Sequence, residues 1–265
     1  MIKTSLTIAL AAAGLAALPL HTALAADKTF EISANALALD IQSELRFDSA
    51  SLGQGTLINF ENDLGLDSSK TAYRYEGRLR LGRNHVLEGS YMDLSRSGTG
   101  TLTQTIQFGD QTYNVATTVD STLDINFYRF AYSYYFINQA NVELGAAIGV
   151  QVPDIDASLI DTNTNITESY SGAVPIPTVG LRANVSVLPN LSLRGSADLF
   201  SLSAGDFDGS LTDISVKAEY RILDTLGIGV GYNKFDIDGS LQNTSQDFAT
   251  NLNYDGASVF LNLRF

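Results

Sequence analysis

The sequence predicts an all-β fold, namely an up-and-down antiparallel β-barrel that spans a membrane, and three observations support this prediction. Apolar and polar residues alternate with a period of two through most of the chain, whereas helical periodicity is almost absent. Short and long connections between the expected strands alternate regularly. Several strands exceed the roughly 5 or 6 residues usual in soluble β proteins. Ten strands fit the pattern best, with eight and twelve as the alternatives.

Residues 1–25 have the pattern of a cleaved secretory signal peptide. Lys3 precedes a long alanine-rich apolar run, and residues 23–25 form an A-x-A cleavage site. This run is too short for a membrane helix, which needs about 20 apolar residues. We therefore expect an exported protein in which residues 26–265 form a single barrel domain.

Composition excludes several classes of function. The 265-residue chain contains no cysteine, so disulfides, thiolate metal sites and cysteine nucleophiles are excluded. The formal net charge of −13 argues against a nucleic-acid partner, because nucleic acid selects basic surfaces. A mean hydropathy near zero is compatible with a barrel, because its strands alternate between apolar and polar residues.

The first half of the mature chain supplies five expected strands. They cover about residues 37–48, 71–83, 86 to beyond 93, 128–136 and 141–150. A polar loop with the sequence INFENDLGLD (58–67) follows the first strand, and a tight turn (82–85) follows the second. A Ser/Thr/Gly-rich hairpin (99–118) is expected to project beyond the membrane, and a short turn follows the fourth strand.

The second half supplies the other five. They cover about residues 174–187, 191–199, 214–222, 226–236 and 257–265. Longer loops are expected at 153–171 and 205–210, and short turns at 189–190 and 223–225. Short connections thus follow the even-numbered strands and longer ones the odd-numbered strands. About twelve residues at about 3.3 Å each, tilted near 40°, cross roughly 30 Å, which is enough for a membrane.

The last nine residues, ASVFLNLRF (257–265), place Val259, Leu261, Leu263 and Phe265 on one face and Asn262 and Arg264 on the other. This stretch, ending on Phe, resembles the terminal strand of small Gram-negative outer-membrane β-barrel proteins. The resemblance implies an integral protein of the outer membrane, with its short turns in the periplasm. It implies outer-membrane lipid and lipopolysaccharide as surroundings, and periplasmic chaperones and the barrel-assembly machinery as partners during biogenesis. Phe265 is then the expected assembly signal.

A soluble lipocalin-like barrel would show the same alternation turned inside out, and the polar face decides between the two. Its bases are mostly Arg, interleaved with acids, and Arg pairs well with carboxylates. This composition favours an ion-paired lumen. Besides Glu88, the expected lumen residues are Asp40, Glu44, Arg46, Arg74, Glu76, Arg78, Arg80, Arg129, Glu143, Arg182, Arg194, Asp198, Lys217, Glu219 and Arg221. In the terminal strand, Asn262 and Arg264 are expected beside Asp40 and Glu44.

No catalytic residue, cofactor or metal ligand set is expected. His85 is the one histidine left after signal cleavage, and it lies in a turn at the periplasmic end. No pair of acids stands out from the ion-pair lining. The segment GIGVG (227–231) lies inside a strand, so small inward-facing residues explain it better than a dinucleotide loop.

Two kinds of loop carry weaker hypotheses. The acidic segments 154–161, 205–209 and 236–239 have oxygen ligands suited to Ca²⁺ or Mg²⁺, although plain solvated loops explain them better. The segment INFENDLGLD is more specific than the architecture requires. It is expected to fold into the barrel mouth as a partial lid.

The predicted function is a non-enzymatic outer-membrane protein with a structural, adhesive or surface-interaction role through its acidic loops. Barrels of about ten strands have a narrow interior, whereas open porins need about sixteen. A narrow channel for small polar solutes is the first alternative, and a lipid-modifying outer-membrane enzyme is the second.

Overall fold

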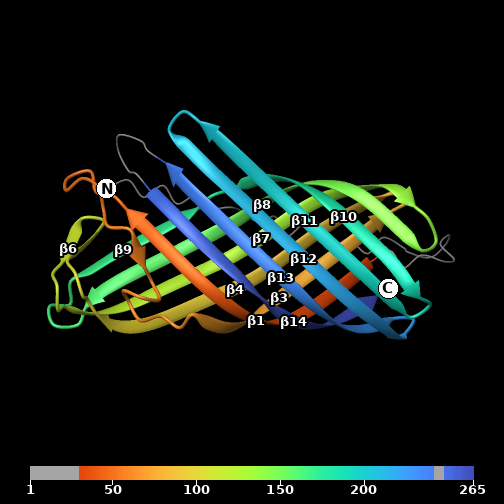
Figure 1. Cartoon of the computed structure of the whole chain (residues 1–265), viewed down its shortest axis with the longest axis horizontal. Helices are drawn as coiled ribbons and strands as arrows, with labels where there is room; N and C mark the ends of the chain where they lie inside the picture. The colour runs from red at the N-terminus through yellow and green to blue at the C-terminus, as the bar shows by residue number, and fades with distance from the viewer. Residues whose placement is uncertain (1–29, 242–247) are drawn as a thin grey trace, which may run out of the picture.

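The computed structural model describes residues 30–241 and 248–265, which form a closed antiparallel β-barrel (Figure 1). Ten barrel strands are present in this part of the chain, as predicted. They are β1 (Phe30–Phe47), β3 (Ser69–Leu81), β4 (His85–Thr101), β7 (Thr118–Asn138), β8 (Val142–Asp161), β9 (Thr167–Ala173) continued by β10 (Ile176–Leu188), β11 (Leu191–Ala204), β12 (Phe207–Leu223), β13 (Leu226–Leu241) and β14 (Phe248–Arg264). The expected signal peptide lies outside the described residues. Among the described residues, no helix is long and apolar enough to cross a membrane.

The first and last strands close the barrel. β1 pairs with β14 along its whole length, from Glu31–Arg264 to Phe47–Phe248. Phe30 and Phe265 therefore lie at the same end as the short turns, and the Phe265 amide donates to the Phe30 carbonyl at 2.9 Å. We call this the short-turn end, and the opposite end, with the longer connections, the loop end.

The outside of the short-turn half is an apolar belt. On β7 the belt consists of Phe130, Tyr132, Tyr134 and Phe136, all exposed. Three tyrosines lie side by side at the edge of the belt nearer the loop end: Tyr75 on β3 faces Tyr91 on β4, and Tyr91 faces Tyr128 on β7. Aromatic rings at the edges of an apolar band are typical of membrane-spanning barrels.

Beyond this belt the polarity of the strands is inverted. Towards the loop end, the outer face of β7 carries Asn126 and Asp124, and its inner face carries the buried Ile125 and Leu123. β14 changes in the same way, with Val259 outside near the short-turn end and Asp255 outside beyond the belt. The loop half is thus built like a soluble barrel, with an apolar core and a polar exterior.

The strands are long because this second half extends them beyond the membrane. β7 has 21 residues, which at about 3.3 Å each and a tilt near 40° rise roughly 50 Å, about twice the apolar band of such barrels. The loop expected at 153–171 is therefore wrong: β8 continues to Asp161 and a tight turn leads into β9. The acidic segments likewise lie largely within β8, β12 and β13 rather than in free loops.

The segment 58–67 completes the barrel wall and fills part of its mouth. Its short strand β2 (Ile58–Asn59) pairs with the upper part of β1, where β3 has not yet begun. Ile58, Phe60 and Leu64 are fully buried in the apolar core. The segment packs so closely on β4 that a Cβ on Gly98 would lie 2.6 Å from the Gly65 carbonyl oxygen.

The Ser/Thr/Gly-rich hairpin lies at the loop end, beyond the apolar belt, but it folds onto the barrel instead of standing free in solvent. Its strands β5 (Ile106–Phe108) and β6 (Gln111–Tyr113) fold over the loop end of the barrel (Figure 1). Ile106, Phe108 and Tyr113 are buried in the apolar core. We call residues 102–117 the lid.

Candidate functional site: the barrel interior

The interior of the short-turn half is filled by ion pairs centred on two buried carboxylates, Glu88 and Asp198. Arg182 contacts Glu88 at 3.0 Å and Asp198 at 2.9 Å. Arg129 contacts the same two carboxylates at 3.1 and 2.7 Å. The two guanidinium groups and two carboxylates therefore form a closed four-membered network from β4, β7, β10 and β11.

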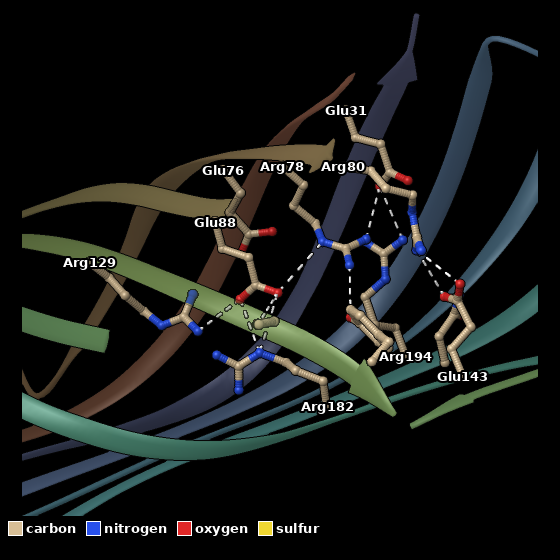
Figure 2. Close-up of polar contacts among 12 residues, drawn as sticks. Glu31, Glu76, Arg78, Arg80, Glu88, Arg129, Glu143, Arg182 and Arg194 are labelled. Carbon is tan, nitrogen blue, oxygen red and sulfur yellow. Dashed lines mark hydrogen bonds and ion pairs between the residues drawn. The ribbon is translucent and has the colours of Figure 1, made fainter. Parts of the chain in front are cut away.

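A third carboxylate, Glu31 on β1, extends this network towards the short-turn end. It contacts Arg194 at 3.1 Å, Arg78 at 3.4 Å and Arg264 at 3.6 Å. Arg78 also reaches Glu88 at 3.8 Å, so the two centres are connected (Figure 2). Arg80 and Glu143 form a separate pair at 2.9 Å beside the turns of the short-turn end.

Further pairs occupy the rest of this layer. Lys217 contacts Glu76 at 2.5 Å, and Arg264 donates to Glu219. Arg74 donates to the Tyr254 hydroxyl at 2.5 Å, where the ion pairs meet the apolar core. We call this whole set of paired side chains the plug. A cavity among its members, beside Arg129, Asp198 and Lys217, has a volume of about 70 Å³, roughly that of two water molecules in the liquid.

Most of the lumen residues expected from the sequence lie in or beside the plug. The inward-facing ones are Arg74, Glu76, Arg78, Arg80, Glu88, Arg129, Glu143, Arg182, Arg194, Asp198, Lys217, Glu219 and Arg221. Arg221 lies at the edge and donates to the Pro189 carbonyl oxygen at 3.3 Å.

The lumen positions expected for Asp40, Glu44 and Arg46 are wrong. Leu39, Ile41 and Leu45 are buried inside the barrel. Because side chains alternate along a strand, Asp40, Glu44 and Arg46 point outwards. The reason is that β1 begins at Phe30, so residues 37–47 lie in the loop half, where polarity is inverted. Arg264 accordingly meets Glu31 and Glu219 instead of Asp40 and Glu44.

Sequence reasoning missed Glu31 and a buried ion pair in the loop half. Arg96 on β4 pairs with Glu61 of the segment 58–67, and their side chains are 2% and 8% exposed. Arg96 also donates to the Ser43 hydroxyl at 2.9 Å and the Asp67 carbonyl at 3.1 Å. The signal in the sequence was that Arg96 shares one face of its strand with the apolar Met92 and Leu94.

Burial also shifts pKa values in the lid. Tyr113 donates its hydroxyl hydrogen to the Leu159 carbonyl oxygen at 3.0 Å, and burial raises its pKa to about 12. Burial and the nearby Asp110 raise the pKa of Glu168 on β9 above its ordinary value. These contacts join the lid to β8 and β9.

The remaining candidates from the sequence are His85 and the acidic segments. His85 lies at the short-turn end on the outside, with Nδ1 2.6 Å from the Tyr132 hydroxyl. Within residues 30–241 and 248–265, no three His, Cys, Asp or Glu side chains are grouped to hold a metal ion. Divalent cation binding by the acidic segments stays a prediction.

Comparison with known proteins identifies the fold. The chain matches no family model and no curated protein sequence. Among solved structures it resembles the outer membrane protease OmpT from Escherichia coli, with a TM-score of 0.57, 12% identity and coverage of 92% of this chain and 99% of OmpT. The fold is that of a Gram-negative outer-membrane β-barrel. The apolar belt and this fold place the barrel in the outer membrane.

Other barrels of this membrane align less closely. The translocator domain of the autotransporter NalP from Neisseria meningitidis is 10% identical over 90% of each chain, with a TM-score of 0.48. Ail, the attachment invasion locus protein of Yersinia pestis, is 11% identical over 87% of this chain and 98% of that chain, with a TM-score of 0.36. Since the proteins in this comparison carry unlike names and activities, the shared fold does not determine whether this chain is an enzyme.

Proposed function

We propose that this chain is a non-enzymatic, non-conducting barrel of the outer membrane, which works through the part that projects from the cell surface. The observation that carries this proposal is the plug. Its Arg and carboxylate side chains fill the lumen across the membrane, and the lid covers the opposite opening. A plugged barrel presents a surface and offers no path to solutes.

The exterior of the projecting half supports a surface-interaction role with a cationic partner. Exposed acids point outwards from β4, β7, β8, β12 and β13: Asp93, Asp120, Asp156, Asp208 and Asp238. Fields of one sign attract partners of opposite charge and raise their rate of association. The apolar belt contacts outer-membrane lipid and lipopolysaccharide, and the barrel-assembly machinery and chaperones act during biogenesis.

The narrow channel is the alternative that one observation favours. A polar vestibule of about 520 Å³ opens at the periplasmic end, between Arg80, Glu143 and Arg264. It leads to the plug, so conduction requires plug side chains to move.

Planar-bilayer recordings distinguish the two. We expect the purified barrel to give no stepwise currents. Stepwise currents that change in Arg78→Ala or Arg129→Ala would support the channel and overturn the proposal.

A binding assay tests the surface role directly. Cells that display the barrel should retain more fluorescent polylysine than cells that display a variant with Asp120→Asn, Asp156→Asn and Asp238→Asn. Equal retention at equal surface levels would refute a role through the acidic exterior.

A further inference from the structure

An apolar cavity of about 310 Å³ lies inside the projecting half, apart from the plug. Five aromatic rings line it: Phe47, Tyr170, Phe200, Phe207 and Phe248. Tyr170 lies edge-on to Phe47, with ring centroids 4.9 Å apart, and stacks on Phe248 at 5.3 Å. Concave, mainly apolar spaces of about this size are typical of sites for small ligands.

The barrel wall is interrupted beside this cavity. The ladder between β10 and β11 ends at Val179–Leu199. Beyond it, in the described residues, β9 pairs only with β8, and residues 200–204 of β11 pair only with β12. The tips of the β8–β9 and β11–β12 hairpins lie far apart in Figure 1. Leu202 is 47% exposed and Val174 is 40% exposed on the two sides of this gap.

The gap opens at the level of the outer leaflet. Val179 and Leu199 are exposed members of the apolar belt, and the ladder ends at them. An apolar chain can therefore pass from the membrane surface along Leu202 and Val174 into the cavity without crossing water. The lid covers the opening of the barrel at the loop end, and the hydrogen bond from Tyr113 to the Leu159 carbonyl oxygen anchors it there.

The charges around the cavity limit the head group of a ligand. None of the described residues that line the cavity is basic, and Asp238 is among them, with its side chain on the outer face of β13. Asp208, on the neighbouring strand, is also exposed at this level. These carboxylates would repel an anionic head group, and none of the described residues that line the cavity is a base that could pair with it.

We propose that this cavity binds the single aliphatic chain of an uncharged amphiphile, which enters sideways through the gap between β9–β10 and β11. The volume equals that of about ten water molecules at about 30 Å³ each, and a methylene group is of similar size, so the cavity holds a chain of about ten carbons. The inference rests on the proposed membrane orientation, but not on the absence of conductance or on the cationic partner.

Two glycines provide a matched pair of variants. Gly239 lines the cavity, and a Cβ built there meets no atom closer than 4.0 Å, so Gly239→Leu fills the space without backbone strain. Gly195 lies on the lipid-facing side of β11 with nothing within 4 Å. Gly195→Leu adds the same side chain outside the cavity.

The test measures binding of tritiated 1-decanol to the barrel in lipid nanodiscs, with empty nanodiscs as the baseline. We expect saturable binding of about one decanol per barrel, at least tenfold weaker in Gly239→Leu and unchanged in Gly195→Leu. Decyl sulfate, with the same chain and a permanent negative charge, should bind at least tenfold more weakly. Absence of saturable binding, or equal binding by both variants, would overturn the proposal.

A measurement on the unmodified protein covers the case in which Gly239→Leu does not fold. A decanol analogue with a terminal diazirine should crosslink to peptides that contain Tyr170, Phe200 or Phe207. Crosslinks confined to belt residues such as Phe130 would contradict the site. Because neither measurement depends on conductance, the outcome is independent of the bilayer recordings.

Discussion

The buried ion pair between Arg96 and Glu61 should fix the segment 58–67 in the barrel wall. Both side chains are almost fully buried, and Glu61 also accepts from the Ser43 amide at 2.9 Å. Arg96→Met removes the guanidinium and leaves a buried, uncompensated carboxylate. Breaking a buried pair from one side typically costs about 3–5 kcal/mol, and we expect this loss in the free energy of unfolding.

The double variant Arg96→Met/Glu61→Leu should recover much of this loss. It leaves no unpaired charge, and buried ion pairs are often replaceable by apolar side chains at little cost. The free energies of the natural chain, of the single variants Arg96→Met and Glu61→Leu and of the double variant give the coupling energy of the pair, which we expect to be about 2 kcal/mol or more.

Equilibrium unfolding by urea in lipid vesicles measures these values. Circular dichroism or the gel shift of the folded barrel serves as the signal, since the chain has no tryptophan. The matched control is Arg80→Met, which breaks the more exposed pair with Glu143 and should cost about 1 kcal/mol or less. If Arg96→Met also lost no more than about 1 kcal/mol, the pair would not hold the segment in place.

Three further predictions concern assembly and the lid. Deletion of Phe265 should reduce folded protein in the outer membrane more than deletion of residues 110–112, because Phe265 closes the β1–β14 seam; normal levels of the truncated protein, judged by heat-modifiable migration, would contradict this. Tyr113→Phe should speed hydrogen exchange in β5 and β6 several-fold, because it loses a buried hydrogen bond worth about 1 kcal/mol, and unchanged exchange would argue against the anchor. The pKa of Glu168 is raised in the folded state, so the protonated form is favoured there. Lid contacts should be strongest below the ordinary Glu pKa and weaken as pH rises through the raised value, and Glu168→Gln should remove this pH dependence of exchange.

The alternation of side chains identified most of the barrel from the sequence because a paired strand has only two faces. In β7, Arg129 marks the face towards the lumen and Phe130 marks the face towards lipid. The same rule failed for β1, where the predicted strand began at Leu37 and its Leu and Ile residues were assigned to lipid. Period two separates the faces of a strand but does not tell which face is inside, and the polarity that decides this changes sign where the barrel leaves the membrane.

The lid and the apolar cavity could not be predicted because they depend on distant segments. Ile106 and Phe108 are two apolar residues in a Ser/Thr/Gly-rich stretch, which is also the pattern of a solvated hairpin. Their burial follows from the apolar inner faces of β1, β7 and β8 below them. The partners of Glu88 likewise come from three other strands, so the sequence indicated the members of the plug but not the pairs.

The inversion of polarity along β7 can be measured most directly by cysteine accessibility, because the natural chain has no cysteine. Single cysteines replace Asp120, Asp124, Phe130 and Tyr134, which all lie on the outer face, and Leu123, which is buried inside. In intact cells a membrane-impermeant maleimide should label positions 120 and 124 and leave 130, 134 and 123 unlabelled. Equal protection of positions 120 and 124, or labelling of position 130, would mean that the loop half does not project from the membrane.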